Sequence, residues 1–237
     1  MERAYTGKEE QIRRLFAAIA PKYDLVNSII SLNLHKGWRA FAVRECDLSD
    51  GDQALDVGAG TLDLSIRLSR EVGSEGKITG IDLCRPMLEM GKKKMDRMGI
   101  TNIDVLETTS DDVPIPSNSI KAAICGFTLR SVPDVKKSLA EMVRVVQRGG
   151  KVVILDLAIP KGGPVKGVYR FYLHNVMPIL GKILTGRREP YVYLASSVER
   201  FYSREQLSRM MQDAGLRNVE VHDLTFGIAT VHIGTKV

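Results

Sequence analysis

Cysteines are few in this sequence, and long apolar runs are absent. The three cysteines, Cys46, Cys84 and Cys125, lie far apart and lack the paired spacing of a zinc site. We therefore expect reduced thiols in a cytoplasmic protein that holds no metal. No stretch approaches the roughly 18 apolar residues of a membrane span, and the first residues are charged rather than apolar. We accordingly expect neither a secreted protein nor an integral membrane protein.

Length and charge set wider bounds. A chain of 237 residues can bury a substantial core, and it contains no internal repeat or low-complexity tract. We expect one domain over residues 1–237. The formal net charge of +6 is compatible with binding to nucleic acid, with binding to an anionic membrane surface, or with solubility alone.

Residues 50–157 alternate short apolar segments with segments of helical spacing. This alternation predicts parallel strands that are joined by crossover helices. Two further apolar segments meet at Gly227 and predict an antiparallel hairpin, which closes the sheet. The predicted fold class is therefore α/β, with a seven-stranded, mostly parallel sheet whose last strand is reversed.

Two segments lie outside this alternation. Residues 8–45 predict a helical arm interrupted by Pro21, and residues 160–203 predict a helical lid insertion before a C-terminal helix and hairpin at 204–237. The insertion mixes apolar residues with basic ones, namely Lys161, Lys166, Arg170, Lys182, Arg187 and Arg188. It would shelter an apolar ligand and hold the protein peripherally at an anionic membrane, at about 1 kcal/mol per basic residue. A solvated basic face over a core helix is the alternative.

A glycine-rich turn follows the first predicted strand. Gly58 and Gly60 allow a tight turn close to a ligand, and the next strand ends at Asp82, which can accept hydrogen bonds from both ribose hydroxyls. A dinucleotide site needs a third glycine where this chain has Asp63, and a carboxylate there repels pyrophosphate. The same carboxylate, with Asp56, favours the sulfonium and ammonium groups of S-adenosylmethionine. The turn therefore favours a methyltransferase over a dehydrogenase, and an ordinary strand-to-helix turn is the alternative.

Seven stretches carry a resemblance that covers nearly the whole chain: residues 16–39, 54–65, 80–94, 113–120, 127–160, 193–216 and 224–237. The most specific parts are YD-x-x-N in the arm, F-x-L-R-x-V-P-D, and the closing T-x-GI-x-x-x-H-x-G-x-K. They resemble the menaquinone/ubiquinone biosynthesis C-methyltransferases. The resemblance implies a class I methyltransferase Rossmann-like fold and S-adenosyl-L-methionine as donor, with S-adenosyl-L-homocysteine as product. It also implies methylation of a ring carbon of an isoprenoid demethyl-quinol.

The resemblance also implies where the donor binds. The expected contacts come from the arm, the glycine turn, the second strand tip, the loop at the adenine edge and the fourth strand: Tyr23, Gly58, Gly60, Thr61, Asp63, Asp82, Leu83, Thr109, Ser110 and Gly126. Tyr23 shares a predicted helix face with Asn27 and would cover the methionine end, unless it only marks a helix boundary after Pro21.

Several residues depart from the family pattern. Leu62 replaces a glycine and would push the turn outward or line the donor pocket, and Asn33 replaces a glycine in the arm. Thr109 and Ser110 stand where the family often has Asn or Asp followed by Ala, and Ser131 stands where Asn is common. These departures indicate a divergent member. They leave open another lipid or small-molecule acceptor, or a donor-binding protein without turnover.

Two residues are candidates for catalysis. A quinol ring carbon becomes nucleophilic when a ring hydroxyl ionises, and a phenol with a pKa of about 10 opposes this by roughly 4 kcal/mol at pH 7. Arg130 would stabilise the phenolate, since a guanidinium accepts protons poorly; an ion pair with Asp134 or an arm carboxylate is the alternative. His35 would act as general base, or would pack structurally beside Trp38.

Other partners receive weaker support from the sequence. No Asn-Pro-Pro-Tyr type base pocket and no catalytic cysteine motif is present, so we expect no nucleic-acid substrate. His174, within the insertion, is a further candidate for contact with the quinol head. Exposed arm and lid surfaces are compatible with a homodimer.

Overall fold

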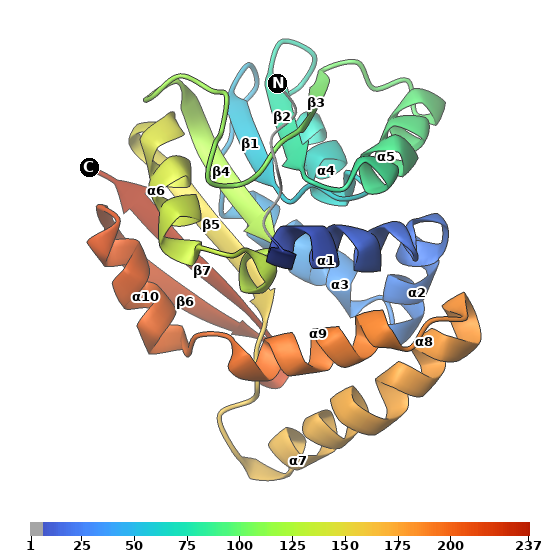
Figure 1. Cartoon of the computed structure of the whole chain (residues 1–237). Helices are drawn as coiled ribbons and strands as arrows, with labels where there is room; N and C mark the ends of the chain where they lie inside the picture. Colours follow the sequence, from blue (N-terminus) through green and yellow to red (C-terminus); the bar gives the residue numbers. More distant parts are fainter. Residues whose placement is uncertain (1–6) are drawn as a thin grey trace.

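A seven-stranded sheet forms the centre of the computed structural model, which describes residues 7–237 (Figure 1). Its strands are β1 (Gln53–Val57), β2 (Lys77–Asp82), β3 (Ile103–Glu107), β4 (Ile120–Gly126), β5 (Val146–Leu157), β6 (Leu216–Leu224) and β7 (Ala229–Lys236). Their order is β3-β2-β1-β4-β5-β7-β6, and β7 runs antiparallel to both of its neighbours. The predicted sheet, with its reversed last strand, is confirmed.

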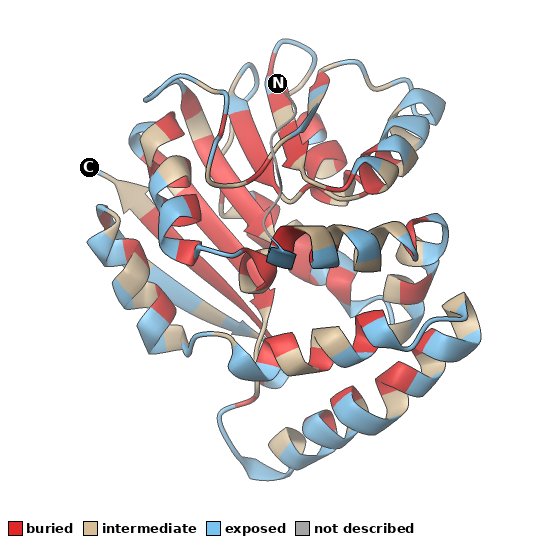
Figure 2. Ribbon diagram, viewed as in Figure 1, coloured by how far each residue is buried: buried red, intermediate tan, exposed pale blue. Residues whose placement is uncertain are grey.

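Helices cover both faces of the sheet, so the central strands are buried on both sides (Figure 2). These helices include α4 (Asp63–Glu71), α5 (Arg85–Arg97), α6 (Val135–Val145) and α10 (Arg204–Asp213). Neighbouring residues of one strand belong to different clusters: Ala54 packs with α4, whereas Leu55 packs with α6. This explains why the strands are continuous apolar runs rather than alternating ones.

The N-terminal arm is helical, as predicted. It comprises α1 (Gly7–Ala17), the short 3-10 turn η1 (Ala20–Lys22), α2 (Tyr23–Ile30) and α3 (Leu34–Arg44). Pro21 falls within η1, where its missing N–H costs no helical hydrogen bond. Asn33 joins α2 to α3 with a φ of 62°, the left-handed conformation that asparagine tolerates better than most residues.

The insertion between β5 and α10 is also helical. It contains α7 (Gly163–Phe171), a π-helical turn (Tyr172–Val176), α8 (Met177–Thr185) and α9 (Glu189–Arg200). Leu173 and Met177 of this insertion pack with Val26 of α2 in a cluster separate from the two sheet layers. Helix α2 and the insertion therefore lie together beyond the carboxyl ends of the parallel strands (Figure 1), whereas α3 packs against the sheet. None of the helices in residues 7–237 has the length and hydropathy to cross a membrane.

Candidate active site

The carboxyl ends of β1, β2 and β4 open into a first cavity of about 960 Å³, open solvent included. The structure brings all the expected donor-binding residues to its lining: Tyr23, Gly58, Gly60, Thr61, Asp63, Asp82, Leu83, Thr109, Ser110 and Gly126. Ligands of open α/β sheets bind at this edge, where neighbouring strands diverge. Residues that are up to about a hundred positions apart in the chain thus form the surface of one cavity. Their contact with S-adenosylmethionine stays a prediction.

The glycine turn has the backbone conformation that glycine alone adopts freely. Gly58 has a φ of +72° and Gly60 a φ of +53°. A Cβ at Gly58 would lie 2.3 Å from the side chain of Thr128, so even alanine would displace a neighbour. Leu62 does not line the cavity, which corrects the expectation that it lines the donor pocket. It is fully buried beneath the turn, against Gly80 and Gly91.

Asp82 is held at the tip of β2 by two backbone amides. The Gly60 N–H donates to Oδ2 at 2.9 Å, and the Cys84 N–H donates to Oδ1 at 2.8 Å. Burial raises the pKa of Asp82 to about 6, although these amides act in the opposite direction. Each carboxylate oxygen keeps a lone pair, so the residue can still accept hydrogen bonds from two ribose hydroxyls.

Asp56 is a second buried carboxylate in the lining of the first cavity. The Ser65 hydroxyl donates to Oδ2 at 2.6 Å, whereas Oδ1 accepts no hydrogen bond within residues 7–237. Burial raises the pKa of Asp56 to about 6. An unpaired carboxylate oxygen in a donor crevice fits a cationic ligand, because a nearby positive charge would favour the ionised form.

Ionic contacts tie the arm to the glycine turn. The Thr61 hydroxyl donates to Asp24 at 2.6 Å, and Lys94 contacts both Asp24, at 2.8 Å, and Asp63, at 2.5 Å. Burial raises the pKa of Asp63, but Arg39 and Lys94 outweigh it and leave this pKa below its ordinary value. Asp63 is therefore ionised at neutral pH, as the preference for a cationic donor requires.

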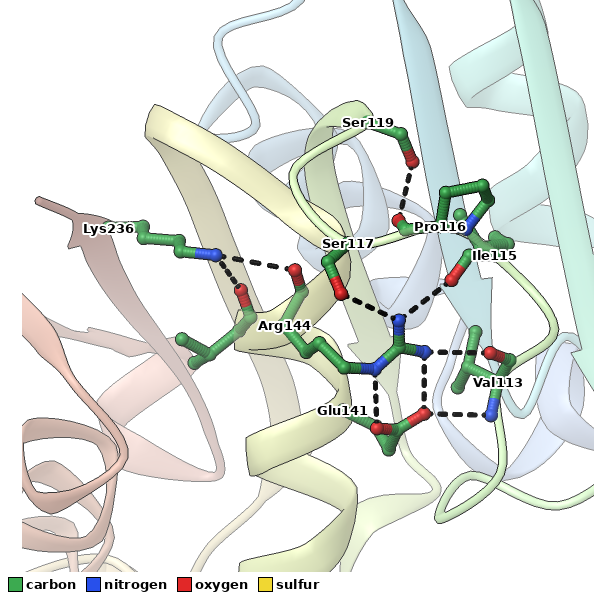
Figure 3. Close-up of polar contacts among 9 residues, drawn as sticks. Val113, Ile115, Pro116, Ser117, Ser119, Glu141, Arg144 and Lys236 are labelled. Atoms are coloured by element: carbon green, nitrogen blue, oxygen red, sulfur yellow. Dashed lines mark hydrogen bonds and ion pairs between the residues drawn. The ribbon is translucent and has the colours of Figure 1, made fainter.

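The loop after β3, which carries Thr109 and Ser110, is anchored by α6 (Figure 3). Arg144 donates to the carbonyl oxygens of Val113 and Ile115, and Glu141 accepts from the Val113 N–H at 3.0 Å. The Ser110 hydroxyl is already hydrogen-bonded to Ser138 at 2.6 Å. These contacts fix the loop in place beside the first cavity, and the Ser110 hydroxyl, at the expected adenine edge, is already engaged.

A second cavity, of about 1430 Å³ with open solvent included, lies under the arm and the insertion. Most of its lining is apolar and comes from α2, α3, α7 and α9 together with the end of β5. It shares four lining residues with the first cavity, namely Phe16, Tyr23, Arg39 and Phe127, which we call the shared wall. A polar crevice thus adjoins a largely apolar chamber across a few side chains.

Arg130 lies in the second cavity and pairs with Asp156 at the end of β5. The expected alternatives, Asp134 or an arm carboxylate, are wrong as partners: Asp134 instead caps α6 by accepting from the Lys137 N–H. The Nε of Arg130 is buried and donates no hydrogen bond within residues 7–237. The pair with Asp156 thus positions the guanidinium and leaves a donor group unused in a largely apolar chamber.

His35 also lies in the second cavity, but both ring nitrogens have neighbours. Its Nδ1 is hydrogen-bonded to Arg39, and its Nε2 lies 3.3 Å from the Ser28 hydroxyl. Burial, followed by the charge of Arg39, lowers the pKa of His35 to about 4. The histidine is therefore neutral at pH 7 and a much weaker base than an exposed imidazole.

His174 does not lie in the lining of the second cavity, so the expected contact with an acceptor is wrong. Its side chain is 42% exposed on the outer side of the insertion and its Nε2 lies 3.2 Å from Glu199. Its place in an apolar segment was misleading, because the helix turns this position toward solvent.

Sequence reasoning missed Arg39 and Phe127 of the shared wall. The Arg39 guanidinium lies 5.2 Å from the centroid of the Phe127 ring and 3.7 Å from Asp63. Phe127 has a φ of +59°, an uncommon conformation for a bulky residue. Both residues fall inside the family-like stretches, but the arm and the fourth strand meet only in the tertiary structure. Across residues 7–237, no three His, Cys, Asp or Glu side chains are grouped so that they could bind a metal ion.

Comparison with curated proteins gives full-length relatives. The chain is 38% identical over 230 residues to a demethylmenaquinone methyltransferase of Bacillus cereus, with 97% of each chain covered. It is also 38% identical over 232 residues to a protein of the same name from Geobacillus kaustophilus, with 98% of this chain and 99% of the relative covered.

Solved structures share the fold at lower identity. A SAM-dependent methyltransferase of Thermotoga maritima, described as a possible histamine N-methyltransferase, matches with a TM-score of 0.66 and 18% identity over 94% of this chain and 99% of that one. A SAM-dependent methyltransferase of Aquifex aeolicus matches with a TM-score of 0.61 and 23% identity over 84% and 89% of the two chains.

These comparisons confirm the predicted α/β Rossmann-like fold, the methyltransferase activity and S-adenosylmethionine as the donor. The family model matches residues 4–236, which is almost the whole chain. The glycine turn, the strand-tip acid and the unpaired Asp56 oxygen fit the sugar and the cationic groups of that donor. This chain belongs to the ubiE/COQ5 methyltransferase family.

Proposed function

We propose that the enzyme transfers a methyl group from S-adenosylmethionine to a ring carbon of an isoprenoid demethyl-quinol, of the demethylmenaquinol kind, in respiratory quinone biosynthesis. The observation that carries this proposal is the shared wall, across which the polar crevice adjoins the apolar chamber. A cationic nucleoside suits the first cavity, and an aromatic head with an apolar tail suits the second. The names of the Bacillus and Geobacillus relatives support the acceptor class.

Arg130 has the charge that the acceptor needs. When bound, the donor supplies an electrophilic methyl group, so the remaining requirement is an electron-rich ring. The guanidinium lies in the apolar chamber with its Nε unused, and there it would stabilise a phenolate more strongly than in water. Asp156 acts as the positioning residue, because its carboxylate holds the guanidinium from the side of β5.

For His35 we propose a positioning role in the second cavity instead of the general base expected from the sequence. With a pKa of about 4, it would take a proton from a phenol only against roughly 8 kcal/mol. Its Nδ1 is also occupied by Arg39. The histidine instead orients Arg39, whose guanidinium is part of the shared wall.

The test is methyl transfer to a defined acceptor. The purified enzyme is mixed with isotope-labelled S-adenosylmethionine and a chemically reduced, short-tailed demethyl-naphthoquinol, and the labelled product is quantified. The double variant Arg130→Gln/Asp156→Asn removes both buried charges, so it avoids the unpaired carboxylate that Arg130→Ala would leave. We expect turnover to fall at least 100-fold and calorimetric affinity for S-adenosylhomocysteine to stay within about twofold, as in the exposed control Arg148→Gln.

The absence of transfer by a wild-type enzyme that binds the donor normally would reject the quinol acceptor. It would favour another lipid or small-molecule acceptor, or a donor-binding protein without turnover. Equal losses of turnover and donor affinity in the double variant would instead move Arg130 from chemistry to the structure of the pocket.

We further propose that the enzyme works as a peripheral protein at the cytoplasmic face of the membrane, where isoprenoid quinols reside. The insertion supports this, because residues 160–188 contain the six basic residues named above and no acidic residue. Such a segment is attracted to anionic lipid in a salt-dependent manner.

A further inference from the structure

Helix α2 has an apolar stripe on its solvent side. Leu25 and Ile29 of the helix, and Leu32 two residues after its end, are spaced four and three residues apart and are 59%, 38% and 81% exposed. Val26, on the neighbouring side of the helix, is buried against the insertion. A helix normally turns its apolar residues inward, so an exposed apolar stripe beside the buried one indicates a second contact surface.

The insertion has a matching stripe. Val168, Phe171, Ile179 and Ile183 recur at helical spacing along α7 and α8, and between 56% and 73% of each side chain is exposed. Tyr169, Leu173 and Met177 form the buried side of the same helices. Figure 2 shows the outer side of α7 and α8 as exposed. The two stripes together form what we call the outer apolar face: Leu25, Ile29, Leu32, Val168, Phe171, Ile179 and Ile183.

Direct contacts hold the segments that carry the two stripes side by side. The Tyr172 hydroxyl donates to the Ile30 carbonyl at 2.6 Å, and the Lys22 ammonium donates to the Leu184 carbonyl at 2.8 Å. In Figure 1, α7 and α8 run along the lower edge of the molecule, and α2 lies next to α8 at the right. The outer apolar face is therefore built from segments that are about 140 positions apart in the chain but adjacent in the fold.

The second cavity opens on this face. Leu32 and Val168 both line the cavity, and both are strongly exposed. Leu32 has a φ of +50°, a conformation that strains any residue with a side chain. Strain of this kind persists where the surrounding fold imposes it, and it is concentrated at functional sites. Here it directs an apolar side chain into solvent at the mouth of an apolar chamber.

The charge around the outer apolar face favours one kind of binding partner. The insertion contributes Lys166 and Lys182 along α7 and α8, and no Asp or Glu occurs between Pro160 and Arg188. Arg170 is also basic but pairs with Glu199 of α9 at 3.1 Å. A second copy of this chain would place its own basic residues against these basic residues, and the like charges would repel each other. An anionic bilayer has the opposite charge and an apolar interior, which matches an apolar stripe with a basic border.

We infer that the outer apolar face docks on an anionic bilayer and places the mouth of the second cavity against the lipid. An acceptor with an isoprenoid tail then enters laterally from the membrane, with its head beyond Leu32 and its tail left among lipid chains. The inference rests on the proposed function for the identity of the acceptor, whereas the docking itself is measured without any acceptor.

Sedimentation with vesicles tests the docking. Wild-type protein is mixed with phosphatidylglycerol or phosphatidylcholine vesicles at low and at high salt. We expect binding to the anionic vesicles that weakens with salt. Ile183→Glu, outside both cavities, should weaken partitioning at least tenfold, and Lys182→Glu should weaken it about 30-fold. The matched controls are Val237→Glu, where the valine is 65% exposed at the C-terminus, and Lys93→Glu on α5; both should bind as wild type does.

Unchanged vesicle binding in Ile183→Glu and Lys182→Glu would overturn the inference. So would light scattering that shows a dimer converted to monomers by Ile183→Glu, because a second copy would then occupy the face. A tail-less, water-soluble demethyl-naphthoquinol separates the two proposals. Wild type and Ile183→Glu should methylate it equally, whereas only wild type should be fast on a long-tailed acceptor in vesicles. If no variant methylates the soluble acceptor, the proposed function fails while the vesicle result stands.

Discussion

Replacement of Asp82 by asparagine should weaken donor binding without unfolding the protein. In Asp82 both carboxylate oxygens accept a backbone N–H, one from Gly60 and one from Cys84. In Asp82→Asn, whichever way the side-chain amide is turned, its N–H₂ group faces one of these backbone N–H groups and cannot accept from it. One hydrogen bond in the turn is then lost, and the negative charge that would accept the ribose hydroxyls disappears.

The magnitude follows from these contacts. A hydrogen bond to a charged group contributes about 1.5–3 kcal/mol, and an unsatisfied buried donor costs a similar amount. We expect the free energy of binding S-adenosylhomocysteine to weaken by about 3 kcal/mol, so its dissociation constant should rise roughly 150-fold. The free energy of unfolding should change little, because burial raises the pKa of Asp82 to about 6 and the variant avoids the cost of ionising that carboxyl at pH 7.

Titration calorimetry and thermal unfolding together provide the assay. The matched control is Asp104→Asn on β3, an exposed aspartate that pairs with Lys77 at 2.7 Å. The control should bind S-adenosylhomocysteine as tightly as wild type does. If Asp82→Asn binds within threefold of wild type, the strand-tip acid does not hold the ribose. If it binds weakly but also melts far below the control, the residue supports the turn rather than the ligand.

Three further predictions follow from the same geometry. Gly58→Ala forces a Cβ to within 2.3 Å of Thr128 at a φ of +72°, so denaturant titration should show a loss of about 2 kcal/mol or more, whereas Gly149→Ala, at a φ of +78° with open space around it, should lose only about 1 kcal/mol. Burial raises the pKa of Asp56 from 3.8 to about 6, so the folded protein binds this proton more tightly and its stability falls as pH rises through that window. Asp56→Asn should therefore raise the melting temperature at pH 7.5 and leave it nearly unchanged at pH 4; a variant that melts below wild type at pH 7.5 would contradict this. Because burial lowers the pKa of His35 to about 4, kcat/KM should rise with pH above 6 without an inflection near 6.5; an inflection there that disappears in His35→Gln would restore its role as general base.

The donor crevice was largely predictable because its residues follow strand ends. A strand that runs into a glycine turn is visible as a contiguous pattern, and the acid at the tip of the next parallel strand must lie beside it. Gly58, Asp82 and Gly126 therefore reach one cavity, as expected from their positions along the chain.

Side-chain direction was much less predictable. His35 and His174 are both helical residues near apolar neighbours, yet one is buried against Arg39 and the other is exposed beside Glu199. Leu62 was expected at the pocket, but the turn directs it beneath the sheet edge, where glycines leave room for it. These outcomes depend on helix rotation and on packing partners that are distant in sequence.

The sequence by itself determined the alternation of strands and helices, the glycine turn and the acid that follows it, because these depend on local propensity and on the periodicity of apolar residues. Only the tertiary structure decided that the arm and the insertion pack together, that Arg130 pairs with Asp156, and that the two cavities share a wall. Such contacts join segments separated by many residues, and their formation depends on three-dimensional packing and burial. This packing and burial decide which charged side chain is paired and which apolar side chain is left in solvent.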